Sequence, residues 1–271
     1  MPPSTGNGVH AQAWTSFPAR VTKADKITEE APMNTTGLKR RQAVTNSTRV
    51  LDFPPPNVAN NGHYFFRTNE KIMKAISSRF LMWVDAVGGY LVCLNNQLSI
   101  GQARPGSKVD IPLLADISSK HARLKREGEE GDYIIEPLAP VLVQNQEIKS
   151  PTLLHHGDVI SLGTAELQFT KPHPLSTSAR LDLIGQSRTS PYTDAIVLMS
   201  DTLIIGNNMA NHIVYHGDEH QIVLYLQNKK LLCRSDQQVN LDGMMEQSGG
   251  ELFYGSQVKS DRISFSLEDA Y

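Results

Sequence analysis

The chain has 271 residues, with 26 Lys and Arg against 28 Asp and Glu, and a formal net charge of −2. This length suits one large or two small domains, and the balanced charge excludes a global attraction to nucleic acid or acidic membranes. No segment approaches the roughly 20 apolar residues of a membrane helix, and the first residues lack the pattern of a signal peptide. We therefore expect a cytoplasmic protein that binds neither nucleic acid nor membrane.

The N-terminal segment, residues 1–62, is rich in Ser, Thr, Asn, Pro and charge and has few bulky apolar residues. This composition predicts a disordered leader that cannot build a core. Residues 63–78 are expected to form a short helix, because five apolar side chains roughly follow helical spacing. These are Phe65, Phe66, Ile72, Met73 and Ile76.

From Arg79 onward, short apolar segments alternate with turn signals such as Gly88-Gly89 and Asn95-Asn96. Short strands with frequent turns and no interleaved helices predict an all-β sandwich over residues 79–172. The Pro- and Ser-containing stretch at residues 173–180 is interpreted as a linker.

The second half repeats the first weakly. Leu203-Ile204-Ile205-Gly206 resembles Leu98-Ser99-Ile100-Gly101, and His220, like His121, precedes an apolar strand. We therefore expect a second, more diverged β domain at residues 181–271, in tandem with the first. Chance similarity between two β-rich stretches is the alternative.

Three motifs follow one another in the first half: Ile100-Gly101-Gln102, Ser118-Ser119-Lys120-His121-Ala122 and Leu154 to Gly163. In this order and at these separations they resemble the forkhead-associated (FHA) domain, a β-sandwich that binds phosphothreonine in partner peptides. The resemblance implies an FHA-like fold and a non-catalytic recognition module without a cofactor. It also implies a phosphorylated partner, from a Ser/Thr kinase pathway.

The resemblance assigns roles residue by residue. Ser118 matches the serine whose hydroxyl donates to the phosphate, and Ser119 and Lys120 lie on the same loop, where the lysine adds a charge-assisted contact. His121 matches a histidine that braces this loop, and Gly101 lets the backbone come close to its neighbours. Gly157 and Asp158 match the tight turn before a strand. They are expected to be structural.

Two positions depart from the family pattern. Gln102 stands where the family has an arginine that grips the phosphate, and Gln lacks the charge and the two-pronged fork. The family asparagine that holds the ligand backbone falls near Ala139-Pro140, although Gln144 and Asn145 occupy a second Asn-Gly position. A charge-assisted bond contributes about 1.5–3 kcal/mol and a neutral one about 1, so both losses together cost roughly two or three orders of magnitude in affinity.

Two cations on the loop after Gly101, Arg104 and Lys108, are candidates to supply the missing charge. The second repeat departs further, because Gly217-Asp218-Glu219-His220 replaces the Ser-x-x-His motif and its acids repel phosphate. We therefore predict that the second repeat does not bind phosphopeptide.

Other residue sets suggest alternatives. His212, His216, Asp218 and His220 are metal-ligand types, which keeps a metal-dependent hydrolase as a minor alternative. The turn character of this segment favours a structural reading, and no nucleophile and base stand at a diagnostic spacing, so we predict neither a metal nor an enzyme. Cys93 and Cys233 lie in apolar runs and are interpreted as reduced, buried thiols rather than as a disulfide.

The sequence thus predicts tandem β-sandwiches that recognise a protein partner without catalysis. The expected phosphopeptide contacts are Gln102, Arg104, Ser118, Ser119, Lys120, Gln144 and Asn145. A phosphate-independent interaction scaffold, which keeps the fold but has lost the phosphate site, is the competing reading.

Overall fold

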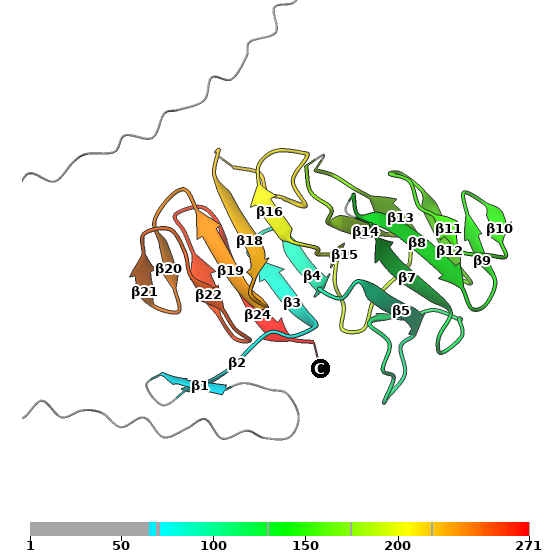
Figure 1. Ribbon diagram of the computed structural model, residues 1–271, viewed down its shortest axis with the longest axis horizontal. Coiled ribbons are helices and arrows are strands. Elements are labelled where there is room, and N and C mark those ends of the chain that lie inside the picture. Colours follow the sequence, from blue (N-terminus) through cyan, green and yellow to red (C-terminus); the bar gives the residue numbers. More distant parts are fainter. Residues whose placement is uncertain (1–64, 69–70, 129, 174, 218, 271) are drawn as a thin grey trace, which may run out of the picture. The chain divides into compact units, whose positions relative to one another are not determined.

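The computed structural model describes residues 65–68, 71–128, 130–173, 175–217 and 219–270. The predicted leader at residues 1–62 lies outside them. The described residues form strands and turns without a helix, which confirms the all-β prediction (Figure 1).

The helix expected at residues 63–78 is wrong. Strands β1 (Phe65–Thr68) and β2 (Lys71–Lys74) pair antiparallel in a two-stranded sheet. Strand β2 then continues into a bridge between Ala75 and Phe253, and the amide of Tyr254 donates to the carbonyl of Lys74 at 3.1 Å. Pairing with residues far away in sequence, together with aromatic and β-branched residues that suit a strand, outweighs the weak helical spacing.

Two five-stranded sheets have the same topology. The first has the order β11-β8-β7-β5-β6 and the second β22-β19-β18-β16-β17, and in each the first strand along the chain pairs parallel with the second and antiparallel with the third. The bounds in the first sheet are β5 (Gln97–Gln102), β6 (Ile111–Leu113), β7 (Ala122–Glu127), β8 (Asp132–Pro137) and β11 (Thr152–Leu153). Those in the second are β16 (Thr202–Gly206), β17 (Ile213–Val214), β18 (Gln221–Gln227), β19 (Lys230–Ser235) and β22 (Glu251–Leu252).

A third sheet of 12 strands has the order β10-β9-β12-β13-β14-β15-β4-β3-β24-β23-β20-β21. Its strands from the first half are β3 (Arg79–Val84), β4 (Gly88–Cys93), β9 (Val141–Val143), β10 (Gln146–Ile148), β12 (Val159–Leu162) and β13 (Ala165–Thr170). Those from the second half are β14 (Ala179–Ile184), β15 (Ala195–Leu198), β20 (Val239–Leu241), β21 (Met244–Glu246), β23 (Gln257–Lys259) and β24 (Ser264–Asp269).

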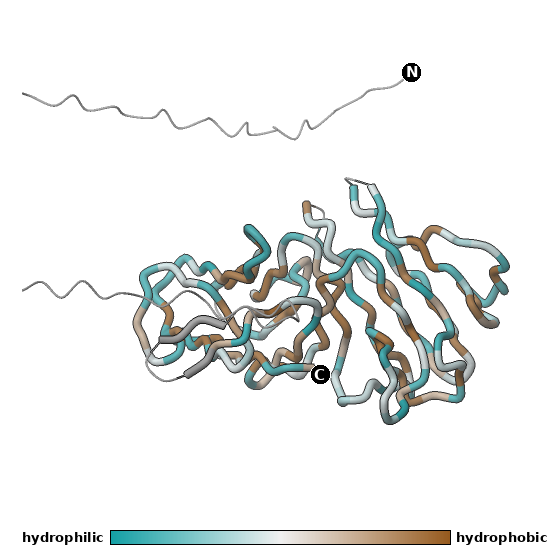
Figure 2. Tube along the Cα trace, turned by 60° about the horizontal axis from the view of Figure 1, so that its bottom comes forward, coloured by the Kyte–Doolittle hydropathy of each residue, from teal (hydrophilic) through white to brown (hydrophobic). Residues whose placement is uncertain are grey.

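The middle strands of the 12-stranded sheet are buried on both faces. Leu91 of β4 and Leu198 of β15 belong to one hydrophobic core, whereas the alternate residues Val92 and Val197 belong to a second core. Because successive side chains of a strand point to opposite faces, a two-sided strand needs a continuous apolar run, as in Ala195–Leu198. The hydropathy view shows these apolar strands inside and hydrophilic segments in the peripheral loops (Figure 2).

Strand pairing does not separate at the predicted linker. Residues 173–180 run into β14, which pairs antiparallel with β13 of the preceding half. The domain limits at residues 79–172 and 181–271 stay a prediction about the sequence repeats. Each sandwich in the structure contains strands from both of these ranges.

Candidate functional site

Three loops of the first sandwich meet at one edge, after β5, before β7 and after β8. The amide of Gln102 donates to the carbonyl of Ser118 at 3.0 Å, which joins the end of β5 to the loop before β7. The amides of Leu138 and Ala139 both donate to the carbonyl of His121 at 3.0 Å, which adds the loop after β8. Hydrogen bonds between backbones therefore fix the three loops relative to one another.

At Gly101, β5 comes close to the loop that precedes β7. A Cβ atom placed on this residue would lie 2.1 Å from the carbonyl oxygen of Ser119 and 3.2 Å from the Cα of Lys120. Any side chain would push these backbone atoms away. The close approach of the two backbones therefore requires a residue without a side chain at this position.

His121 is buried and its ring connects two loops. Its Nδ1 accepts a hydrogen bond from the amide of Ser118 at 3.1 Å, and its Nε2 lies 2.8 Å from the carbonyl oxygen of Pro140. A carbonyl only accepts, so Nε2 carries the proton and the neutral tautomer makes both bonds. The bond to Pro140 was missed by sequence reasoning, because a backbone carbonyl leaves no signature in residue type.

The side chains that project from this edge are polar. Ser118, Ser119 and Lys120 are exposed next to one another, and Arg104 and Lys108 are exposed on the loop after β5. Hydroxyls and cations of this kind suit an anionic ligand.

Gln102 does not point freely to solvent. Its Nε2 donates to the carbonyl of Ala115 at 3.0 Å, and its Oε1 accepts a hydrogen bond from Nε of Arg104. Gln102 thereby holds the guanidinium of Arg104 beside the position at which the sequence pattern expected an arginine. A hydrogen bond thus joins Gln102 and Arg104, which the sequence analysis placed in one site.

Gln144 and Asn145 lie elsewhere, in the turn between β9 and β10, with φ angles of 51° and 61°. The amide of Gln144 donates to the carbonyl of Val159 at 2.9 Å, and its Nε2 donates to Asp158 at 3.2 Å. Both residues build a hairpin turn, whose geometry requires positive φ. These contacts connect Gln144 to β12 and to the turn that precedes it.

Asp158 and Gly157 stabilise the turn that precedes β12. The buried Asp158 accepts a hydrogen bond from the amide of His155 at 2.7 Å, while Gly157 has a φ of 93°, a conformation that favours glycine. The amide of Gly157 donates to the carbonyl of Phe169 at 2.8 Å, which fixes the turn against β13. These contacts hold the turn in place between His155 and β13.

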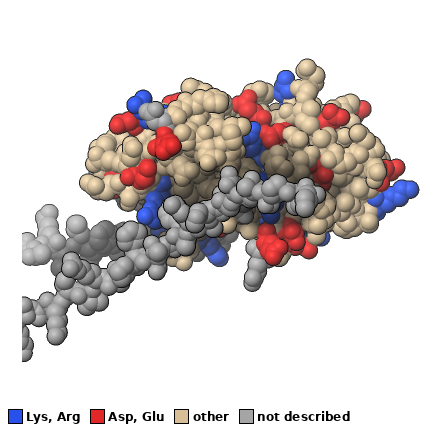
Figure 3. All heavy atoms as spheres, turned by 90° about the horizontal axis from the view of Figure 1, so that it is seen from above, with Lys and Arg blue, Asp and Glu red and all other residues tan. Residues whose placement is uncertain are grey.

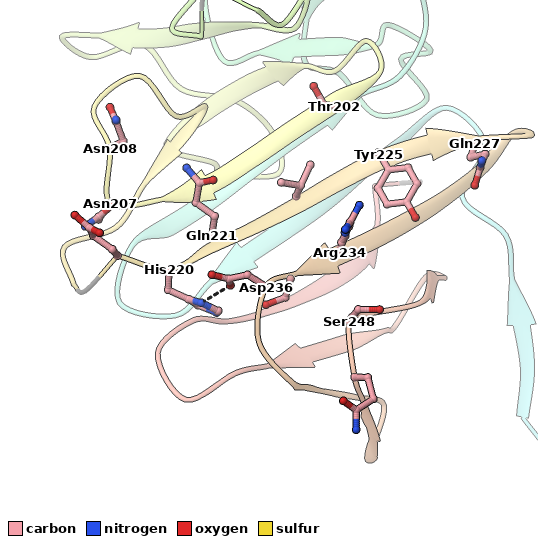
Figure 4. Close-up of a pocket in the computed structure, with 14 residues that line it drawn as sticks. Thr202, Asn207, Asn208, His220, Gln221, Tyr225, Gln227, Arg234, Asp236 and Ser248 are labelled. Atoms are coloured by element: carbon pink, nitrogen blue, oxygen red, sulfur yellow. Dashed lines mark ion pairs between the residues drawn. The ribbon is translucent and has the colours of Figure 1, made fainter. Parts of the chain in front are cut away.

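The second sandwich has a groove of about 1250 Å³, which extends along β18 from His220 to Gln227 (Figure 4). Its lining includes Asn207, Glu219, His220, Arg234 and Asp236, and the buried Nδ1 of His220 lies 2.9 Å from Oδ1 of the exposed Asp236. The figure shows this pair, with Arg234 on the neighbouring strand. Glu219, which directly precedes His220, stands where the first sandwich has Lys120.

The described members of the suggested metal-ligand set are His212, His216 and His220. No three His, Cys, Asp or Glu residues lie close enough together to hold a metal ion among the described residues, which do not include Asp218. His212 is buried, its Nδ1 accepts a hydrogen bond from the amide of Ile204 at 3.1 Å, and burial lowers its pKa to about 4, helped by His173. This is the environment of a neutral core histidine.

Charge on the described surface is mixed. Acidic and basic side chains are interspersed on the face shown in Figure 3. Local groups, rather than a broad field of one sign, therefore determine electrostatic recognition on that face. The described part of the chain contains no helix with the length and hydrophobicity needed to cross a bilayer.

A comparison with family models agrees with the motifs. Residues 98–163 match the family model of the FHA domain. The solved structure named "Rv0020c_FHA Structure" is 20% identical, with 34% of this chain and 91% of that chain covered and a TM-score of 0.21. No curated protein matches the chain. FHA domains are in general non-catalytic modules that bind phosphorylated peptides.

Proposed function

We propose that this FHA domain protein binds phosphothreonine-containing partners of a Ser/Thr kinase pathway in the cytoplasm, through the loops around Ser118. The observation that carries the proposal is the exposed run Ser118-Ser119-Lys120, held by the buried His121 in the segment that matches the family model. Hydroxyl, backbone and ammonium donors on one rigid loop suit a phosphate group.

Arg104 takes the place of the arginine that the family pattern has at position 102. Its guanidinium is bonded to Oε1 of Gln102, and the Gln102 side chain is in turn fixed to the carbonyl of Ala115. A guanidinium donates through several N–H groups, so the bond through Nε leaves its terminal nitrogens for the phosphate. Lys108 on the same loop adds a second exposed charge.

A direct test measures binding of the full chain to a degenerate phosphothreonine peptide pool by fluorescence anisotropy, before and after phosphatase treatment. Ser118→Ala and the double variant Arg104→Ala/Lys108→Ala are each expected to lower affinity at least tenfold. The matched control is Lys149→Ala/Lys259→Ala, which removes two exposed cations outside the three loops and should leave affinity unchanged.

The competing function is a phosphate-independent interaction scaffold. Ala139 and Pro140, at the position of the family asparagine, favour it, because neither side chain can hold a ligand backbone. Equal binding before and after phosphatase treatment would select the scaffold. Unchanged affinity of Arg104→Ala/Lys108→Ala would instead reject the role of these cations alone.

A further inference from the structure

The two halves of the chain are related by an internal two-fold arrangement. The order of the 12-stranded sheet reads the same from both ends when each strand is matched to its counterpart, with β13 matched to β24, β14 to β3 and β15 to β4. The two middle strands, β4 and β15, pair parallel. A two-fold axis along these strands exchanges the faces of the sheet, which agrees with one core on each face.

Backbone hydrogen bonds repeat in detail at the end of each half. The amide of Gly157 donates to the carbonyl of Phe169 at 2.8 Å, and the amide of Gly255 donates to that of Leu267 at 2.7 Å. In the reverse direction, the amide of Phe169 donates to the carbonyl of Asp158 at 2.8 Å. The amide of Leu267 likewise donates to the carbonyl of Ser256 at 3.0 Å. Each residue of the first set lies 98 positions before its counterpart in the second set. The strands β13 and β24 are therefore equivalent, independently of any resemblance in sequence.

The equivalent hairpins β3–β4 and β14–β15 are exchanged between the two sandwiches. Strand β13, the last of the first repeat, pairs with β14 of the second repeat, and β24, the last of the second, pairs with β3 of the first. The registers of the two pairings correspond. Phe169 of β13 lies opposite Leu181 of β14, and its counterpart Leu267 of β24 lies opposite Met82 of β3. Without exchange, β13 would pair with β3 and β24 with β14.

The exchanged hairpins fill the cores. Leu181 of β14 and Ile196 of β15 are 0% exposed in the core of the first sandwich, and Phe80 and Met82 of β3 are 0% exposed in that of the second. Burying one such side chain contributes about 1.5–3 kcal/mol. Each sandwich therefore depends on several buried residues from the other repeat.

We infer that the second repeat is the built-in folding partner of the FHA domain: it supplies β14 and β15 to the first sandwich and receives β3 and β4 in return. Because this role needs no ligand, a repeat that lacks the residues of the phosphate-binding motif can perform it. It does not depend on the proposed phosphopeptide function.

Engineered disulfides in the full chain test the exchange. Cα atoms of directly opposed residues lie within the range that a disulfide spans, and Gln168 faces Asp182 in the exchanged pairing. Gln168→Cys/Asp182→Cys should therefore crosslink under mild oxidation. The control Ser266→Cys/Asp182→Cys would join β24 to β14, the pairing of an unexchanged chain, and should stay reduced. Non-reducing peptide mapping distinguishes each engineered disulfide from any disulfide that involves the native Cys93 or Cys233.

Cleavage of the folded full chain gives the second readout. A protease site is inserted next to Leu175, which is 91% exposed. After cutting, the two fragments should elute together at the size of the intact chain and separate only in denaturant. The inference is overturned if the fragments separate in native buffer, if the 168–182 crosslink fails to form, or if the 182–266 crosslink forms instead.

Discussion

The ring of His121 joins Ser118 to Pro140, with Nδ1 3.1 Å from the Ser118 amide nitrogen and Nε2 2.8 Å from the Pro140 carbonyl oxygen. One buried side chain thus fixes the loop that carries the exposed hydroxyls to the loop on its other side. The position of the candidate phosphate site is set from the interior, by a residue that a ligand does not reach.

Replacing His121 by alanine should weaken both the fold and the binding site. Two hydrogen bonds are lost and the Ser118 amide loses its partner, which predicts a fall of roughly 2–3 kcal/mol in the free energy of unfolding. Affinity for the phosphothreonine peptide pool should drop at least tenfold, and hydrogen exchange of the Ser118 amide should accelerate. His216→Ala, at an exposed histidine, is the control and should change none of these. An unchanged exchange rate at Ser118 would show that His121 does not hold the loop.

Gly101→Ala is expected to disrupt the candidate site loop at Ser118–Lys120 specifically. The added methyl group would meet the backbone of Ser119 at 2.1 Å, and a backbone carbonyl can move only if the loop moves. Gly206→Ala is the matched variant in the second repeat, where the methyl meets Nδ2 of Asn211 at 2.5 Å. Urea denaturation should show destabilisation by both variants, whereas peptide anisotropy should show a loss of affinity for Gly101→Ala. Equal losses of affinity would contradict a local effect.

The two cysteines should be inert in the folded protein. Burial, with a further contribution from Asp110, raises the pKa of Cys93 to about 12, and burial also raises the pKa of Cys233. The reactive thiolate is therefore scarce at pH 8. Ellman's reagent should detect almost no thiol in native buffer and both thiols in guanidinium chloride. Rapid native reaction would contradict the burial, and fewer than two thiols after unfolding would indicate a disulfide.

Local patterns in the sequence predicted the strands and marked the candidate loop, because both depend on neighbouring residues. Alternation and turn residues mark the strands, and the segment Ser118 to Ala122 carries the loop motif within five positions. The link between Gln102 and Arg104 was not foreseen, because it depends on rotamers fixed by the carbonyl of Ala115. The exchange of hairpins was also missed. Either pairing of β13 buries the same types of side chain, so composition does not distinguish them.

Acidification should destabilise the protein through His212. Burial lowers the pKa of this histidine from 6.5 to about 4 in the folded state, and the proximity of His173 adds to the effect. Between these two pH values the unfolded chain binds a proton that the folded chain does not, so stability is fully present above pH 6.5 and falls as the pH decreases towards 4. The difference corresponds to roughly 3 kcal/mol, reached near pH 4.

The measurement is urea denaturation at pH 7 and pH 4.5, for the unaltered chain and for His212→Asn. Asparagine retains an acceptor for the Ile204 amide but does not titrate, so the variant should lose less stability between the two pH values than the unaltered chain. His216→Asn, at an exposed histidine, should behave as the unaltered chain does. If His212→Asn shows the same pH dependence as the unaltered chain, another group is responsible for the acid sensitivity.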